Sequence, residues 1–208
     1  MNILYCLLLY AAPVIIGPQT DEVELKIRDL EFFEDRKCTL SLNQVASPGF
    51  QAKFNKDLNF VPKDYNTGSA YWVKLKLEMP DIKKGFLLEF FDQTIDSLDV
   101  YVMHSGESRF QYYQMGDMMP FSEKLMAHKN FQIQLEGEGS YLIYFRVKSH
   151  EYADIRVAIR SYTRFVEYAL AEYYLYGIFY GMILIISLYN MLIYSAMREV
   201  KYLYYTFY

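Results

Sequence analysis

Residues 71–78 read YWVKLKLE, and from Val73 onward apolar residues alternate with charged ones. Val73, Leu75 and Leu77 fall on one side of an extended chain, and the two lysines between them fall on the other. Side chains alternate between the two faces of a β-strand. The stretch therefore predicts a strand with one face in a core and the other in water.

The same two-residue period recurs outward from this stretch, in residues 23–28, 131–135 and 155–160. Residues 86–91, 98–103 and 141–147 are more uniformly apolar, as the central strands of packed sheets are. Clusters of Gly, Pro, Ser and Asn separate these segments and predict turns. About eight strands in roughly 140 residues predict an all-β domain, a jelly-roll-like antiparallel β-sandwich.

A second decisive stretch, residues 173–197, reads YYLYGIFYGMILIISLYNMLIYSAM and holds 25 consecutive uncharged residues. As a helix it would be about 37 Å long, more than the ~30 Å hydrocarbon core of a bilayer requires. Tyrosines gather at both of its ends, as they do at membrane interfaces. We therefore expect the sandwich to be followed by a transmembrane α-helix.

A short charged turn, with Arg198, Glu199 and Lys201, follows this stretch, and residues 202–208 (YLYYTFY) are again apolar. The pattern predicts a second spanning helix that begins here, and hence a larger polytopic protein. Basic residues favour the cytoplasmic side of a membrane. The turn is therefore expected in the cytoplasm and the sandwich outside the inner (cell) membrane, in a periplasmic or extracellular position.

The N-terminal residues 3–16 carry no charge. A run of about fourteen apolar residues suits a secretory signal peptide and is too short to span a bilayer. Pro13 and Gly17 favour cleavage before residue 20, although no clear cleavage motif is present. An uncleaved anchor, or a buried strand or helix of a soluble protein, are the alternatives.

Three parts follow from these patterns. Residues 1–19 are predicted to be a signal peptide, residues 20–165 a β-sandwich sensor domain, and residues 166–208 a first transmembrane helix with the start of a second. Without the signal peptide, Cys38 is the one remaining thiol and no intrachain disulfide can form. We expect Cys38 to be a small core-facing strand residue, with a reactive thiol as the alternative.

Composition excludes several classes of protein. The chain is 53% hydrophobic and contains only 10 Gly and 6 Pro, which excludes disordered and collagen-like chains. Its 21 basic and 25 acidic residues give a net charge of −4, so no nucleic-acid partner is expected.

Catalytic motifs are missing from the sequence. It contains no nucleophile elbow, no zinc-protease motif and no phosphate-binding loop. The histidines fit no metal-ligand spacing and are expected at the surface or in turns, whereas a group of aspartates is expected at strand ends, with a calcium site as the alternative. We expect no catalytic residue, metal or cofactor in this part of the protein. The residues concerned are His104, His128, His150, Asp92, Asp96 and Asp99.

Ligand binding is the more promising use of a β-sandwich. Aromatic rings stack on the C–H faces of sugars, and nearby amides and carboxylates hold the hydroxyl groups. Trp72, the one tryptophan, falls on the polar face of its strand, and Tyr112 and Tyr113 lie near a predicted loop. We predict these three as ligand-binding residues. The alternatives are that Trp72 packs in a second layer or at an edge, and that the tyrosine pair occupies an ordinary edge strand.

Several segments also occur in the order found in a known family. They are Glu34-Asp35, the phenylalanine-rich 54–60, NTGSAYWVKLKL (66–77), LDVYV (98–102), GDMMPFSEK (116–124), YFRVKS (144–149) and the C-terminal block 176–208. With them the chain resembles the extracellular sensor half of bacterial seven-transmembrane receptors with diverse intracellular signalling modules. One departure is Lys124, where the family has arginine.

The resemblance implies a jelly-roll domain similar to carbohydrate-binding modules, which reports a ligand through the membrane helices to a kinase, cyclase, phosphatase or DNA-binding module. We therefore expect the ligand-sensing input region of a receptor that binds a small extracellular ligand such as a saccharide. Its expected partners are that ligand, membrane lipid and a second copy of the full-length receptor, as a homodimer. The alternative is a membrane-tethered carbohydrate-binding or adhesion module without signalling.

Overall fold

The computed structural model describes residues 12–80, 84–120, 126 and 128–207. Lys124 and residues 1–11 of the predicted signal peptide therefore lie outside the described residues. The chain divides into two compact units, Met1–Tyr162 and Thr163–Tyr208.

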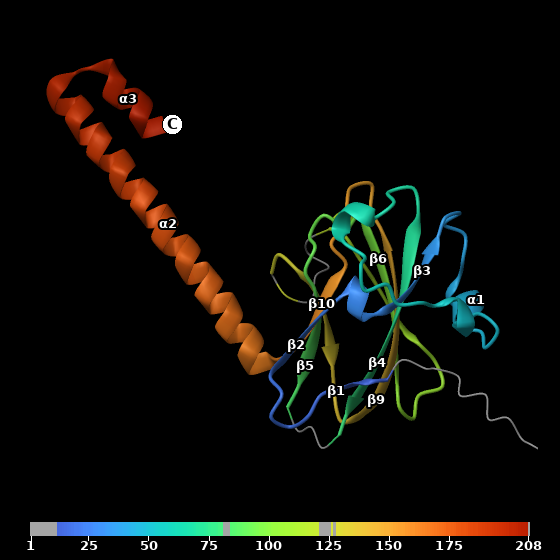
Figure 1. The fold of residues 1–208 in the computed structure, drawn as a ribbon. Helices are drawn as coiled ribbons and strands as arrows, with labels where there is room; N and C mark the ends of the chain where they lie inside the picture. Colours follow the sequence, from blue (N-terminus) through green and yellow to red (C-terminus); the bar gives the residue numbers. More distant parts are fainter. Residues whose placement is uncertain (1–11, 81–83, 121–125, 127, 208) are drawn as a thin grey trace, which may run out of the picture. The chain divides into compact units, whose positions relative to one another are not determined.

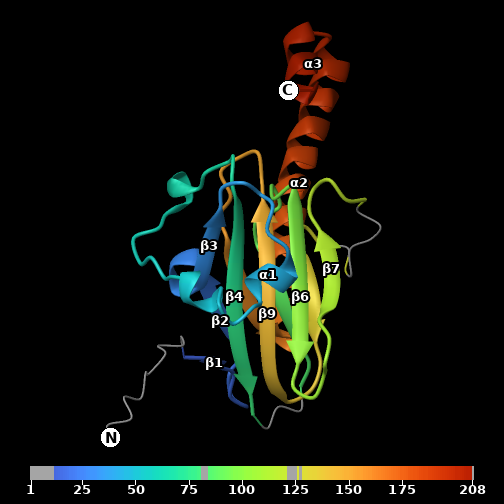
Figure 2. The same ribbon diagram turned by 90° about the vertical axis from the view of Figure 1, so that its right-hand side faces the viewer.

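The first unit consists of two β-sheets that face one another (Figures 1 and 2). The strand order of the first sheet is β1-β4-β9-β6-β7, with β3 also paired to β4, and that of the second sheet is β2-β10-β5-β8. The first sheet contains β1 (Val14–Ile15), β3 (Glu31–Asp35), β4 (Ala70–Met79), β6 (Ser97–His104), β7 (Gln111–Met115) and β9 (Gly139–Lys148). The second contains β2 (Glu22–Lys26), β5 (Phe86–Phe90), β8 (Phe131–Leu135) and β10 (Arg156–Ser161).

The core lies between the sheets and is built by the predicted alternation. Val73, Leu75 and Leu77 of β4 are at most 2% exposed and belong to the main apolar cluster. Their neighbours in β9, Ile143 and Phe145, belong to the same cluster. The sandwich is thus confirmed. With its long helix the whole chain is mixed α/β rather than all-β, and the jelly-roll connectivity stays a prediction.

The opposite face of β4 is not in water as expected. Trp72 and Lys74 on this face are 1% and 4% exposed. Apolar side chains from the connection between β3 and β4, including Phe50 and Phe54, form a second cluster on Trp72 and Tyr144. This connection contains α1 (Leu42–Val45) and the 3₁₀ turns η2 (Gln51–Lys53) and η3 (Pro62–Asp64), while η1 (Ile27–Asp29) joins β2 to β3.

The turn after β3 contains Cys38, so its expected place in a strand is wrong. Asp35 ends β3 because its carboxylate accepts the backbone N–H groups of Lys37 (3.3 Å) and Leu40 (2.9 Å). Cys38 has a φ of 54° within this turn and is half-buried.

The short strand β1 lies inside the range predicted as signal peptide. Val14 and Ile15 pair in parallel with Leu77 and Glu78 of β4, and Ile16 is fully buried in the main core. In the structure residues 14–16 thus match the buried strand that is the alternative to a signal peptide. Cleavage after residue 19 stays a prediction, and it would remove β1 and Ile16 from the sandwich.

The second unit is helical. α2 (Tyr162–Met197) runs for 36 residues without a break, and α3 (Val200–Phe207) follows after Arg198, which has a φ of 55°. None of the most apolar 18-residue window of α2 is buried, and by length and composition the helix could cross a membrane. The predicted helix, the charged turn and the second helical start are all present.

Candidate functional site

A groove with a volume of about 760 Å³ lies between the edge strands β7 and β8. These strands are the last of their sheets, and Figure 2 shows β7 beyond β6. Apolar side chains that belong to or pack on the core line part of it, among them Val102, Met115, Phe131 and Ile133. The volume falls in the range of small-molecule sites.

One end of the groove, at the β6–β7 and β8–β9 turns, is polar and acidic. The carboxylate of Glu107 accepts a hydrogen bond from Gln111 Nε2 (3.0 Å), and Gln111 Oε1 accepts one from the hydroxyl of Tyr113 (2.9 Å). Across the groove, the carboxylate of Glu136 accepts a hydrogen bond from the amide of Gln134. Glutamine amides thus orient both carboxylates.

Both carboxylates affect the pKa values of two tyrosine hydroxyls. Burial raises the pKa of Tyr113 and of Tyr141, and the carboxylates of Glu107 and Glu136 raise both pKa values further. The Tyr141 hydroxyl donates to the backbone carbonyl of Glu136. The hydroxyls therefore stay neutral and the local potential is negative.

No Lys or Arg side chain is among the described residues that line the groove. The basic residue there is His104, whose ring lies 4.5 Å from that of Tyr141. Its Nε2 lies 2.9 Å from the carbonyl oxygen of Glu138. That nitrogen must donate to the carbonyl, so the ring is held at the rim by the β8–β9 turn.

Of the predicted ligand-binding residues, the two tyrosines line the groove and Trp72 does not. Tyr113 packs on the core, whereas Tyr112 is 52% exposed and its hydroxyl donates to Asp99 (2.7 Å). The Trp72 ring stacks on Tyr101, which stacks on Tyr112, with centroid distances of 5.9 and 5.0 Å. Trp72 is 1% exposed and packs in a second layer, as in the alternative given for it. The tyrosine pair lies in the edge strand β7, as in the alternative given for that pair. Ligand contact by these residues stays a prediction.

Sequence reasoning did not single out Glu107, Glu136 or Tyr141. Glu107 and Glu136 lie in turns about thirty residues apart, and no local pattern links them. They approach one groove because β7 and β8 are the edges of different sheets.

The three aspartates bind protein groups around strand ends and turns. Asp92 accepts the backbone N–H of Asp154 (2.7 Å), and Asp99 accepts Arg146 Nη1 (3.3 Å). Asp96 accepts the backbone N–H of His150 (2.7 Å) and lies 2.6 Å from its ring Nδ1, and these bonds hold the pKa of Asp96 below its usual range. Within the described ranges, no group of three His, Cys, Asp or Glu side chains could hold a metal ion.

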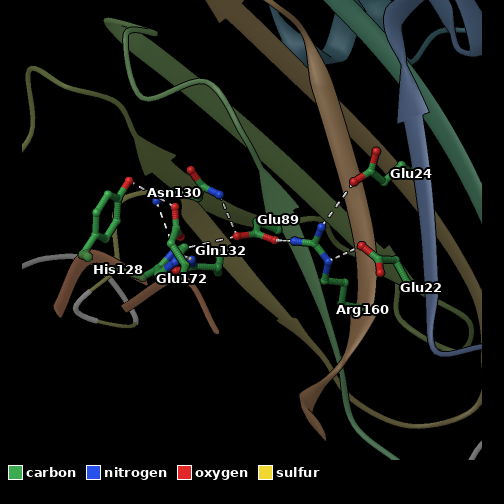
Figure 3. A network of polar contacts seen from close by, with 9 residues as sticks. Glu22, Glu24, Glu89, His128, Asn130, Gln132, Arg160 and Glu172 are labelled. Atoms are coloured by element: carbon green, nitrogen blue, oxygen red, sulfur yellow. Dashed lines mark hydrogen bonds and ion pairs between the residues drawn. The ribbon is translucent and has the colours of Figure 1, made fainter. Parts of the chain in front are cut away.

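A buried polar network lies on the second sheet (Figure 3). Arg160 of β10 is surrounded by the carboxylates of Glu22 (2.6 Å), Glu24 (3.3 Å) and Glu89. The other oxygen of Glu89, which is fully buried, accepts a hydrogen bond from Asn130 Nδ2 (2.8 Å).

His128 extends this network. The histidines are expected at the surface or in turns; His128 lies in the bend before β8, and at 4% exposed it is buried rather than at the surface. Its Nδ1 accepts the backbone N–H of Asn130 (3.3 Å), lies 3.0 Å from Gln132 Nε2 and is 3.7 Å from Glu89 Oε1. The backbone N–H of Asn130 and the amide of Gln132 can donate to Nδ1, whereas the Glu89 oxygen can only accept. The network connects β8, which borders the groove, with Arg160, two residues before α2 begins.

These features define a class: a β-sandwich domain with a groove at one edge, followed in the chain by a long apolar helix. A model of the family "7TMR-DISM extracellular 2" matches residues 28–161, more than half of the chain. The chain therefore belongs to this family, and its sandwich is an extracellular sensor domain of the seven-transmembrane receptors with diverse intracellular signalling modules.

The chain resembles solved structures only weakly. A Bacillus thuringiensis Cry1Da tryptic core variant is 9% identical, with 72% of this chain and 25% of that chain covered and a TM-score of 0.34. A carbohydrate-binding module of the β-sandwich superfamily is 9% identical, with 45% and 41% covered and a TM-score of 0.24. This chain thus spans less than half of either structure, and at these scores neither likeness bears on fold or ligand. No curated protein matches the sequence.

Proposed function

We propose that the chain is the ligand-sensing input region of a bacterial transmembrane receptor. One observation carries this proposal: the family match ends at residue 161, and α2 begins at Tyr162. β10 and α2 are consecutive in the chain, and the proposed signal passes from β10 to the start of α2.

The proposed ligand is a small extracellular molecule such as a carbohydrate. The groove supports this choice, because it combines tyrosine rings with glutamine amides and two carboxylates. Rings contact the C–H faces of a sugar, and amides and carboxylates bind its hydroxyls. Tyr112 and Tyr113 are the predicted residues that the groove favours as contacts, while Trp72 supports Tyr112 through the aromatic stack.

A ligand changes the receptor only if it favours one conformation over another. The proposed route begins at Gln132, which lines the groove and contacts His128, and continues through Glu89 to Arg160. Movement of β8 on ligand binding would alter the buried pairing of Arg160, and with it the chain entering α2.

The proposed setting follows the same logic. α2 crosses the inner membrane, the sandwich lies in the periplasm or outside the cell, and two full-length receptors form a homodimer. This region itself catalyses no reaction, and any enzymatic output belongs to a separate module of the receptor.

A glycan array probed with the full chain in lipid nanodiscs tests the proposal. A bound glycan is then added in hydrogen-exchange measurements on residues 156–166. We expect at least one saccharide to bind and to change exchange where β10 meets α2. Binding with unchanged exchange there would favour a tether without signalling, and an array without binding would overturn the saccharide as ligand.

A further inference from the structure

We propose that the groove between β7 and β8 selects an amino sugar, with the protonated amine bound between Glu107 and Glu136. This inference rests on the proposed function and names the class of saccharide. It separates the site from a general sugar platform, which would bind neutral and charged glycans alike.

Two carboxylates lie at one end of the groove. Glu107 comes from the β6–β7 turn of the first sheet, and Glu136 from the β8–β9 turn of the second. The side-chain donors to these carboxylates are the neutral amides of Gln111 and Gln134, and neither carboxylate has a cationic partner in the described part of the chain. Two like charges at one end of a groove favour a cationic ligand group.

Shared neighbours bring the two glutamates to the same end of the groove. The backbone N–H of His104 donates to the Glu107 carboxylate (3.4 Å), and the His104 ring lies 4.5 Å from that of Tyr141. The Tyr141 hydroxyl donates in turn to the backbone carbonyl of Glu136, and both glutamates line the groove. An ammonium group at this end would be attracted by both carboxylates.

The remainder of the groove offers contacts for a sugar ring. Tyr113 and the apolar side chains Val102 and Met115 can contact the C–H faces of a pyranose ring. Gln111 and Gln114 bring amide groups of the kind that bind sugar hydroxyls. A simple alkylamine would leave these amides unused, and a neutral glycan would leave the carboxylates unpaired.

A matched pair of ligands tests the proposal. The full chain in lipid nanodiscs is titrated by calorimetry with the glucosamine tetramer and with the N-acetylglucosamine tetramer, at mildly acidic pH, where the free amines are protonated and the carboxylates ionised. The two differ in the charge of the amine and its acetyl group. We expect the glucosamine tetramer to bind at least about 10-fold more tightly, from the charge-assisted contacts.

Single substitutions test whether Glu107 and Glu136 bind the amine. Glu107→Gln and Glu136→Gln should each weaken binding of the glucosamine tetramer by about 5- to 30-fold and reduce the discrimination between the two tetramers. Glu138→Gln is the matched control, because Glu138 is an exposed neighbour in the same turn whose side chain does not line the groove. It should change affinity less than about twofold. An unchanged thermal unfolding midpoint shows that each variant is folded.

The remaining outcomes separate this inference from the proposed function. Equal affinity for both tetramers, or equal losses in Glu138→Gln and Glu107→Gln, would overturn the amino-sugar site and leave a saccharide sensor standing. Binding of neither tetramer would also overturn the amino-sugar site, and the glycan array would then decide the proposed function independently.

Discussion

Arg160 is the residue on which the buried network depends. Its side chain is 3% exposed and faces three carboxylates, of which that of Glu89 is fully buried. Glu22 and Glu24 remain partly exposed, so water reduces the cost of their charges. Glu89 has no such relief and relies on Arg160 and the amide of Asn130.

Replacement of Arg160 by methionine should lower the free energy of unfolding by about 3–5 kcal/mol, because it leaves a buried carboxylate without its cation. Urea unfolding followed by the fluorescence of Trp72 measures this. Arg36→Met is the control, since Arg36 is 81% exposed in its pair with Glu34 and its loss should cost less than about 1 kcal/mol. Similar losses in the two variants would contradict the role assigned to the network.

Because of Tyr65, the free energy of unfolding should change with pH in the alkaline range. Burial raises the pKa of Tyr65 to about 12, from 10.0 in the unfolded chain, although the backbone N–H of Ser149 donates to its hydroxyl and opposes the shift. The folded protein thus keeps the neutral phenol. Its contribution is complete below pH 10 and is lost as the pH rises from there to about 12.

The stability advantage of the wild type over Tyr65→Phe should therefore shrink by about 2–3 kcal/mol across that interval. Chemical unfolding of both proteins, just below pH 10 and near pH 12, gives the difference directly. A difference that stays constant with pH would show that Tyr65 ionises equally in the folded and unfolded states.

At the scale of the elements, β1 is the least expected strand, because its residues lie in a stretch that resembles a signal peptide. Ile16 is fully buried, while its neighbour Ile15 is 62% exposed. Ile16→Ala should lower stability by about 2–4 kcal/mol, through lost burial and a cavity, and Ile15→Ala by less than about 1 kcal/mol. Equal, small effects would mean that β1 does not belong to the folded sensor domain.

The strands that sequence reasoning found are those with one face in the core. The alternation in β4, β8 and β10 is visible because one face of each strand packs in the core, while polar residues recur on the other. On β4 this second face is nevertheless buried, because the β3–β4 connection covers it. β7 shows no such period, because at an edge its sequence QYYQM carries mostly polar and aromatic residues; an edge strand is predicted there only as the alternative for Tyr112 and Tyr113.

The candidate site was only partly predictable. Tyr112 and Tyr113 are predicted as aromatics near a loop, and both line the groove. The two glutamates are not predicted from the sequence. They approach one another because β7 and β8 are the edge strands of the two sheets, and no local sequence pattern indicates which strands lie at the edges. The burial of Trp72 is not evident from its strand, because the residues that cover it follow no regular period.

At the scale of the whole molecule, the length of α2 matters. Its 36 residues span about 54 Å, well beyond the ~30 Å hydrocarbon core. The charged residues Arg164, Glu167 and Glu172 fall in its first eleven residues, before the uncharged run begins at Tyr173. This first part of α2 precedes the uncharged run that, by length and composition, could cross a membrane.

The orientation of the chain across the membrane tests the central claim most directly. In a variant with both native cysteines changed to serine, Glu151→Cys places a thiol on the exposed β9–β10 connection, and Glu199→Cys places one in the turn after α2. A membrane-impermeant maleimide should label Glu151→Cys in intact spheroplasts and label Glu199→Cys only after permeabilisation. The reverse pattern, or equal labelling of both variants before permeabilisation, would contradict an extracellular sensor joined to a membrane helix.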